Sequence, residues 1–387
     1  MKIRELVEKY EDQIIAWRRE FHENPELSGE EIRTSERVYE ELKKVNIEVK
    51  RMGKTGVLGI LKGSKSGKTV ALRADMDALS IQEANDIPYK SKNKGVRHAC
   101  GHDGHTAMLL GAAKLLSQMK EIIKGTIKFI FQPAEEIAKG ANMMIEEGAL
   151  EGVDAILGIH LWADLAVGKV SLESGPRMAS ATLFKITIKG KGGHGSLPHQ
   201  GIDAIMAASA VAMNLQSIVS REINPMDSAV VTIGKINGGD RFNILCDKVT
   251  LEGTTRCFNN QIGDTLPAIM ERIVRKTAEA YRAKGELEYT ILTPPLINDI
   301  NLSNISSQAL IKNYGEKAIV KLERTMAGED FAFYSQKVPI VFAFVGARNE
   351  NKSAKYPHHN RNFNIDEDAL VIGTSLYSQF ALDFLNK

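Results

Sequence analysis

The sequence predicts an α/β protein that carries a second, separately folded domain. Strand-like apolar runs alternate with helix-like stretches over the first 180 residues, which favours a largely parallel sheet. Residues 181–293 instead follow the order βαββαβ, the ferredoxin-like split motif. The chain has 387 residues, too many for one ordinary core. We therefore predict a mixed, largely parallel sheet with helices on both faces, formed by 1–180 and 294–387, and an inserted lid or dimerisation domain at 181–293.

The N-terminal segment favours two helices. Apolar residues recur near helical spacing until Pro25 ends the run. Ser28 and Glu31 fit a capping box that would open the second helix. His22 and Glu26 lie close to this junction, and we interpret them as loop and cap residues rather than metal ligands.

Polar residues follow the strands of the predicted sheet. Strands are expected at 57–61, 69–73, 126–131 and 153–159, and a helix at 105–119. The polar residues placed just past the carboxyl ends of these strands are Asp75, Asp77, Glu135, Glu136 and His160. Open α/β sheets bind ligands in the crevice beyond those ends. The sequence thus predicts one site at this edge of the sheet.

The inserted domain and the final segment complete the predicted order of elements. Strands are expected at 182–188, 229–236, 249–255 and 287–292, with helices at 202–219 and 266–281. A helix, a strand, the loop 326–331, a strand at 341–345 and a closing helix from 366 follow. An insertion of this kind is tolerated where its two ends lie close together.

Composition excludes several classes of protein. The net charge of +2 creates no strong field for nucleic acid or acidic membranes. No apolar run reaches membrane-span length, and acidic residues occupy the place of a signal-peptide core. Three cysteines are an odd number in a long chain, so we expect no disulfide framework and a reducing cytoplasm.

Two glycine-rich stretches imitate nucleotide-binding loops. The segment 63–69 is one residue short of a phosphate loop and precedes a strand, where a helix is needed. The segment 190–195 matches G-x-G-x-x-G, but Lys235 stands near the end of the next strand, where a ribose-binding acid is expected. We interpret the second stretch as a turn that presents His194.

The segment 97–105 contains three His, one Cys and one Asp, which favours a metal site. Thiolate sulfur and imidazole nitrogen are preferred by zinc and its transition-metal neighbours. Cys100 and His102 could share one ion if Gly101 allows the backbone to turn between them. The alternative is a His-rich helix start with a buried free cysteine.

A second group of candidate ligands raises the expected number of ions. There are five candidate ligands, which is more than a single structural or catalytic zinc ion uses. They are Cys100, His102, Glu136, His160 and a His near the C-terminus. Five ligands suit a pair of ions that can activate water and polarise a carbonyl. Glu135, next to a ligand, could move the proton from water to the leaving nitrogen. Asp77 could support a ligand His through its second ring nitrogen, or simply cap a strand end.

The motifs together resemble a known family. They are RADMDALS, RHACGHDGH, FQPAEE, GIH, GKGGHGSLPH, NGGDRFNIL, GTTR, MAGEDF and YPHHNRNF. Nearly end to end, the chain is similar to the dinuclear-metal amidohydrolases and carboxypeptidases. This family includes hippurate hydrolases, N-acyl-amino-acid deacylases, auxin-conjugate hydrolases and thermostable archaeal carboxypeptidases. The resemblance is strongest to the branch with Cys in C-G-H-D-x-H.

The resemblance implies a role for each matching residue. The implied metal ligands are Cys100, His102, Glu136, His160 and, from the His pair near the C-terminus, His359 rather than His358. It implies that Glu135 is the general base and Asp77 its supporting acid. It further implies that His194 stabilises the oxyanion, in dimeric members often from the neighbouring subunit. Asn243 and Arg256 resemble residues that bind the substrate carboxylate, a task that suits a guanidinium.

The resemblance also implies cofactors, partners and a reaction. We expect two divalent ions per chain, Zn first, with Mn, Co or Ni as alternatives. The expected reaction is hydrolysis of the amide of an N-acyl amino acid or a short peptide with a free carboxylate. Deacylase and metallocarboxypeptidase or dipeptidase remain open, as does an inactive binding protein, or a structural zinc site with the function in the lid. We expect a homodimer or higher homo-oligomer.

Four departures from the family pattern concern the surroundings of the site. Ser80 stands where Pro is usual, 137–139 replaces a Gly-rich run, Cys246 replaces a Pro, and Asn360 with Arg361 replaces Ser-Pro. None of them removes an implied ligand or the base. They leave the choice of substrate open rather than the reaction class.

Overall fold

Two compact units form the computed structural model, which describes residues 2–387. Unit 1 comprises the chain up to Gly175 together with Ile297–Glu323 and Phe333–Lys387. Unit 2 comprises Pro176–Leu296 and Arg324–Ala332. The sequence had placed 324–332 with the final segment of the catalytic domain, whereas the structure packs this loop with unit 2. Among residues 2–387, no helix is long and apolar enough to cross a membrane.

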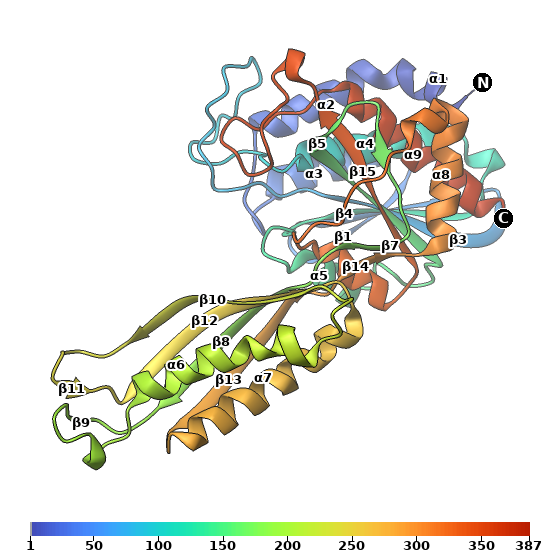
Figure 1. Cartoon of the computed structure of the whole chain (residues 1–387). Helices are drawn as coiled ribbons and strands as arrows, with labels where there is room; N and C mark the ends of the chain where they lie inside the picture. The colour runs from blue at the N-terminus through green and yellow to red at the C-terminus, as the bar shows by residue number, and fades with distance from the viewer. Residues whose placement is uncertain (1) are drawn as a thin grey trace. The chain divides into compact units, whose positions relative to one another are not determined.

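A seven-stranded mixed sheet organises unit 1 (Figure 1). Its order is β1-β2-β4-β3-β5-β15-β6. The strands are β1 (Glu48–Met52), β2 (Gly56–Lys62), β3 (Lys65–Asp75), β4 (Lys124–Gln132), β5 (Ala155–Ala166), β15 (Ile340–Arg348) and β6 (Val170–Ser171). The four central strands β4, β3, β5 and β15 are parallel, and the edge strands are antiparallel. The predicted fold class is confirmed.

Helices pack against this sheet through its alternating side chains. They are α1 (Ile3–Val7), α2 (Glu11–Glu23), α3 (Ile32–Lys44), α4 (His102–Gln118), α5 (Gly140–Glu146), α8 (Ile300–Tyr314) and α9 (Asp368–Leu385). Ile127 and Phe129 of β4 join the apolar core that α4 and α9 share. Lys128, between them, points to the opposite face, where its Nζ donates to carbonyls just after α5.

Two local predictions in unit 1 were wrong. The predicted capping box does not form at α3: Ser28 donates instead to Asp77, and Glu31 accepts from the Gly29 backbone. Glu26 does cap this helix, since it accepts the backbone N–H groups of residues 33 and 34. His22 is a buried residue of helix α2 rather than part of a loop.

Unit 2 contains a four-stranded antiparallel sheet in the order β10-β12-β8-β13, as the βαββαβ pattern predicts. Its elements are β8 (Ala181–Lys189), β9 (Gly193–His194), α6 (Ala204–Leu215), β10 (Ala229–Gly238), β11 (Ile244–Leu245), β12 (Lys248–Cys257), α7 (Asn260–Ala280) and β13 (Lys284–Thr293). Strands β9 and β11 pair separately, and β7 (Gly175–Met178) pairs with β14 (Leu296–Asn298). A one-sided core lies between this sheet and its two helices.

Candidate metal centre

The register of the central sheet brings the polar residues of three strands to one level. Asp75 pairs with Gln132 across β3 and β4, and Arg73 pairs with Gly158 across β3 and β5. His160 therefore lies level with Asp75, although β5 continues to Ala166. The prediction that His160 follows the end of its strand was wrong, because this strand extends past its neighbours. The predicted position at the edge of the parallel strands still holds.

A glycine turn delivers the next two donors. Gly101 has φ +99°, a left-handed conformation that Gly adopts without strain, and it precedes the first turn of α4. Cys100 lies on one side of this turn and His102 on the other. The Cys100 Sγ lies 3.5 Å from Nε2 of His160.

Several groups of possible ligands are found among the described residues, and two of them, which have one member in common, contain the five predicted ligands. In each group the donor atoms lie within 4.8 Å of one another. The two groups are Cys100, His102 and His160, and Cys100, Glu136 and His359. These are the five ligands that the sequence predicts, and Cys100 belongs to both groups.

Hydrogen bonds fix which atoms of these side chains face inward. His102 donates from Nδ1 to the Asp77 carbonyl at 2.9 Å, and Asp77 Oδ1 lies 3.2 Å from the same nitrogen. His160 donates from Nδ1 to the Leu161 carbonyl at 2.7 Å. With Nδ1 engaged in this way, each ring directs Nε2 at the centre. A histidine that binds a metal is held in this way by a partner on its other nitrogen.

Two buried atoms at this centre, each able to bind a metal ion, have no hydrogen-bond partner among the described residues. His102 Nε2 and Glu136 Oε1 are enclosed and accept no hydrogen bond within residues 2–387. A buried polar atom without a partner costs about 1–3 kcal/mol. Sulfur, nitrogen and carboxylate donors with unused lone pairs fit one or two divalent cations of the zinc group.

The charges around the centre favour a cation. Burial and then the Glu136 carboxylate raise the pKa of the Cys100 thiol, so without positive charge the thiolate is disfavoured. Contact with Cys100 and then Glu136 raises the pKa of His359 to about 10. Burial lowers the pKa of His160 well below its usual value. Negative partners thus surround a position where a cation would stabilise the thiolate.

Two neighbouring histidines, His105 and His358, form hydrogen bonds to other groups. His105 donates from Nδ1 to Asp75 at 2.6 Å and accepts the Leu161 N–H on Nε2 at 2.8 Å. His358 accepts the Ala163 N–H on Nε2 at 3.0 Å. The group around Glu136 contains His359 and not His358.

The turn that bears the two glutamates is held by Asp77, which the sequence assigns to the site, and by Glu31, which it does not. Ala134 has φ +56°, a conformation that costs energy for a residue with a side chain. Buried Glu31 accepts the Ala134 N–H at 2.9 Å, and Asp77 accepts the Glu136 N–H at 3.0 Å. Half-buried Glu135 lies between these contacts, its carboxylate within 4.8 Å of the donor atoms of His102 and Glu136.

Unit 2 places its candidate residues at two separate positions. His194 is exposed and pairs with Ile244 across β9 and β11, and the Asn243 carbonyl accepts the Gly195 N–H at 2.9 Å. Arg256 lies near the other end of β12, where it donates to the Ser180 carbonyl at 3.3 Å. The eight residue-to-residue steps from 248 to 256 span about 26 Å of extended strand. One chain therefore cannot bring Asn243 and Arg256 to the same carboxylate.

Residues 71–383 match the model of peptidase family M20/M25/M40. The chain belongs to peptidase family M20/M25/M40. An N-acetyl-L-cysteine deacetylase of Bacillus subtilis is 42% identical over 93% of this chain and 85% of that protein. Thermostable carboxypeptidase 2 of Saccharolobus solfataricus is 41% identical over 100% of this chain and 99% of that protein.

A solved structure extends the likeness of this M20/M25/M40 member to the fold. A Bacillus subtilis protein described as a dinuclear metal-binding peptidase of the M20 family superposes with a TM-score of 0.86. The two are 37% identical, and the match covers 98% of this chain and 99% of that one. The predicted family resemblance is confirmed.

If each group of three donors holds one ion, Cys100→Ala should weaken binding of both ions, because Cys100 belongs to both groups. His160→Ala and His359→Ala should each weaken one, and each loss should exceed about tenfold. Zinc titration of the metal-free protein against a competing chelator would measure both affinities. A Cys100→Ala protein that keeps one ion at wild-type affinity would contradict the shared position of Cys100.

Proposed function

We propose that this protein is a metal-dependent hydrolase that cleaves the amide bond of N-acyl amino acids or short peptides with a free carboxylate. The observation that carries the proposal is the convergence of five donors into two groups around Cys100, with Glu135 beside them. The names of the two curated relatives, a deacetylase and a carboxypeptidase, agree with this class of substrate. The two activities break the same kind of bond.

Each residue at the centre receives a role in this proposal. Cys100, His102, Glu136, His160 and His359 would hold two divalent ions, Zn first, with Mn, Co or Ni able to use the same donors. Bound there, the ions would activate water and polarise the scissile carbonyl. Glu135 accepts the proton of the attacking water and delivers it to the leaving nitrogen as the C–N bond breaks. Asp77 fixes the ring of His102 and the backbone of Glu136.

Residues of unit 2 act on the substrate rather than on the ions. We propose that His194 donates a hydrogen bond to the oxygen that gains charge on the carbonyl. Arg256 binds the free carboxylate of the substrate through its planar guanidinium. Asn243, whose backbone carbonyl accepts the Gly195 N–H beside His194, would bind the same carboxylate from a second copy of the chain.

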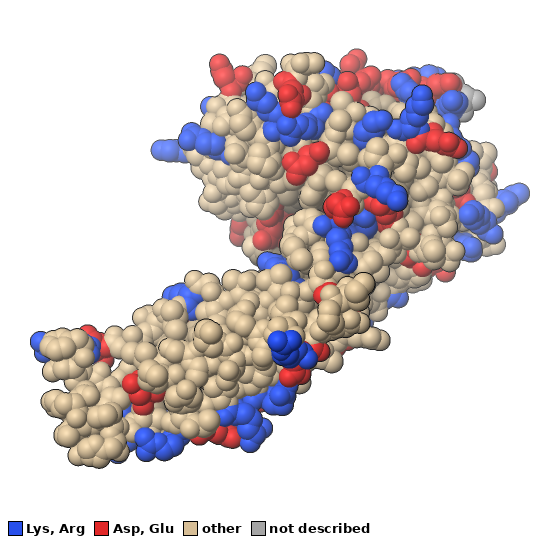
Figure 2. Space-filling model, in the orientation of Figure 1, with Lys and Arg blue, Asp and Glu red and all other residues tan. Residues whose placement is uncertain are grey.

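The distance between Asn243 and Arg256 supports a homodimer. Since one chain cannot place both on one substrate, His194 and Asn243 would serve the site of a second copy. Helix α6 contains no Lys, Arg, Asp, Glu or His, yet it exposes Ile205, Met206 and Met213. The surface over this helix shows few charges (Figure 2). Strand β10 beside it is an open sheet edge, which a second copy can extend.

The role of Glu135 predicts the outcome of one substitution. Glu135→Gln should reduce turnover by about 10²- to 10⁴-fold, because an amide cannot carry the proton. The assay should include N-acetyl and N-benzoyl amino acids and dipeptides, so that deacylase and carboxypeptidase activities are separated. Metal analysis should find the same number of ions as in the wild type.

The matched control is Glu147→Gln, the same change at an exposed position after α5. It should leave turnover unchanged. Unaltered turnover in Glu135→Gln would overturn the assignment of the base. A wild-type protein that holds two ions and hydrolyses no member of the panel would overturn the proposed reaction.

The proposed dimer predicts a change in oligomeric state. Replacing both Met206 and Met213 with Asp should yield a monomer, because a charge buried without a partner at an interface is costly. Light scattering after size-exclusion chromatography would measure the mass. Leu183→Asp, at an exposed site on the opposite face of the unit 2 sheet, should remain dimeric. A dimer that survives the double substitution would exclude this face as the interface.

A further inference from the structure

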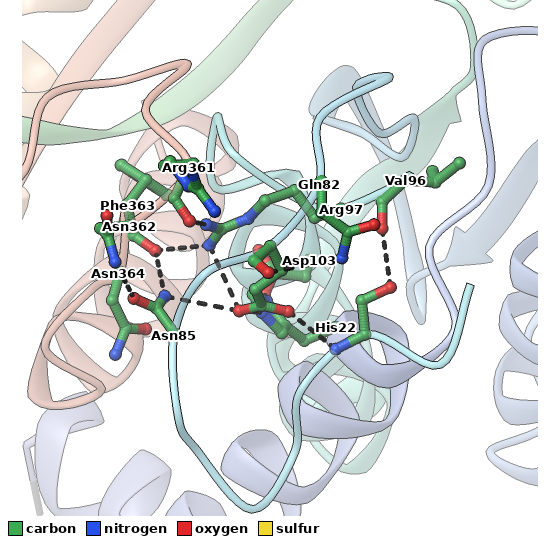
Figure 3. A network of polar contacts seen from close by, with 12 residues as sticks. His22, Gln82, Asn85, Val96, Arg97, Asp103, Arg361, Asn362, Phe363 and Asn364 are labelled. Carbon is green, nitrogen blue, oxygen red and sulfur yellow. Dashed lines mark hydrogen bonds and ion pairs between the residues drawn. The ribbon is translucent and has the colours of Figure 1, made fainter. Parts of the chain in front are cut away.

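A buried network of charged side chains lies beside the metal centre without contributing a ligand (Figure 3). Its members are at most 3% exposed and come from α2, from the segment before Cys100 and from the start of α4. They are Arg18, His22, Glu83, Arg97 and Asp103. Charges this deep are tolerated only when they are paired, and loss of one partner leaves another unsatisfied. The mechanism above uses none of them.

The network joins two carboxylates and two guanidinium groups through the ring of His22. Its Nδ1 lies 2.8 Å from Asp103 Oδ2, and its Nε2 lies 3.1 Å from Glu83 Oε1. Arg18 Nε donates to the same Asp103 oxygen at 2.9 Å, and an Arg97 amino group lies 3.5 Å from Glu83 Oε1. Although burial opposes it, the hydrogen bond from His22 lowers the pKa of Glu83 to about 2. The ring of His22 thus has a carboxylate beside each of its nitrogens.

At one end of this network, Arg97 hydrogen-bonds to the loop that carries His359. The Arg97 guanidinium donates to the carbonyls of Arg361 and Phe363. Asn85 also donates to the Phe363 carbonyl, at 2.9 Å. The His359 N–H donates to the Ala99 carbonyl at 2.8 Å. The backbone before Cys100 and the backbone after His359 are therefore joined by one arginine side chain.

His359 needs such support more than the other candidate ligands. Its side chain is 53% exposed, whereas those of His102 and Glu136 are 1% and 10% exposed. Its φ of +62° lies in the left-handed region, which costs energy for a residue with a side chain. The residues around it, 355–364, belong to no helix or strand. Because packing does not fix the side chain of His359, its position depends on how the backbone around it is held.

We propose that Arg97, held in place by Glu83 and His22, is a positioning residue that sets His359 in the second group of ligands and so determines how tightly that group binds its ion. The inference rests on the proposed two-ion centre. Arginine suits the task because its planar fork reaches two carbonyls at once, which a lysine ammonium on a flexible stem does not. Asn85 is a weaker support for the same loop.

The test is titration of the metal-free full chain with Co²⁺ and with Zn²⁺ in Arg97→Lys. Lysine keeps a positive charge opposite Glu83 but loses the hydrogen bonds to the carbonyls of Arg361 and Phe363. We expect the ion held by the group that contains His359 to bind about 10- to 100-fold less tightly, the range for loss of a residue that supports a ligand. The affinity of the other ion should stay unchanged. The Co²⁺ absorption of the affected ion should shift, since its His ligand is displaced.

Two further variants separate positioning from general stability. Arg18→Lys perturbs the same network through Asp103 and touches the loop only at the Asn364 side chain. It should lower the midpoint of thermal unfolding without selective loss of one ion. In a His359→Ala background, Arg97→Lys should have no further effect on metal affinity. Asn85→Ala should reproduce the selective loss to a smaller degree, and it remains informative if Arg97→Lys does not fold.

The outcomes distinguish the two proposals. A wild-type chain that binds no metal would overturn the proposed function. Two ions bound with equal affinities in wild type, Arg97→Lys and Asn85→Ala would overturn the positioning role and leave the centre intact. An equal loss for both ions in Arg97→Lys would show a purely structural role and would also contradict the inference.

Discussion

The structure depends on one constraint: it encloses side-chain atoms whose lone pairs accept no hydrogen bond. His102 Nε2 and Glu136 Oε1 are enclosed without a hydrogen-bond partner within the described chain, and the Cys100 thiol lies close to both His160 and His359. Folding into this arrangement is unfavourable unless something positive neutralises it. A pair of cations would do so and would also convert the thiol to thiolate. The fold thus forms a frame of surrounding residues that holds these metal-binding atoms away from other hydrogen-bond partners.

Much of that frame consists of bonds between the backbone and a buried carboxylate. Asp77 accepts from Ser28, from the ring of His102 and from the Glu136 backbone. Glu31 accepts from Thr55 and from the turn at Ala134. Each carboxylate ties the N-terminal segment to the loop that bears the two glutamates. The segment 26–31 is distant in the sequence from every ligand, yet it shapes the turn on which Glu135 and Glu136 sit.

The sequence was sufficient for the fold class, the family and the group of residues that converge. Periodicity and motif spacing are local properties, and Gly101 between Cys100 and His102 signals its turn directly. The failures have a common cause. The capping box at Ser28 and Glu31 was wrong because both side chains bond to residues far along the chain. The network around His22 and Arg97 was missed for the same reason, since no spacing reports a bond from Arg97 to Phe363. The roles of the residues in unit 2, and that unit's predicted role as a lid, remain predictions.

The central claim is that two ions share Cys100. Anomalous X-ray scattering at the zinc edge, from crystals grown with Zn²⁺, tests it most directly. The account predicts two peaks in each chain, one among Cys100, His102 and His160 and one among Cys100, Glu136 and His359, both within bonding distance of the same sulfur. A single peak, or two peaks of which only one contacts Cys100, would contradict it.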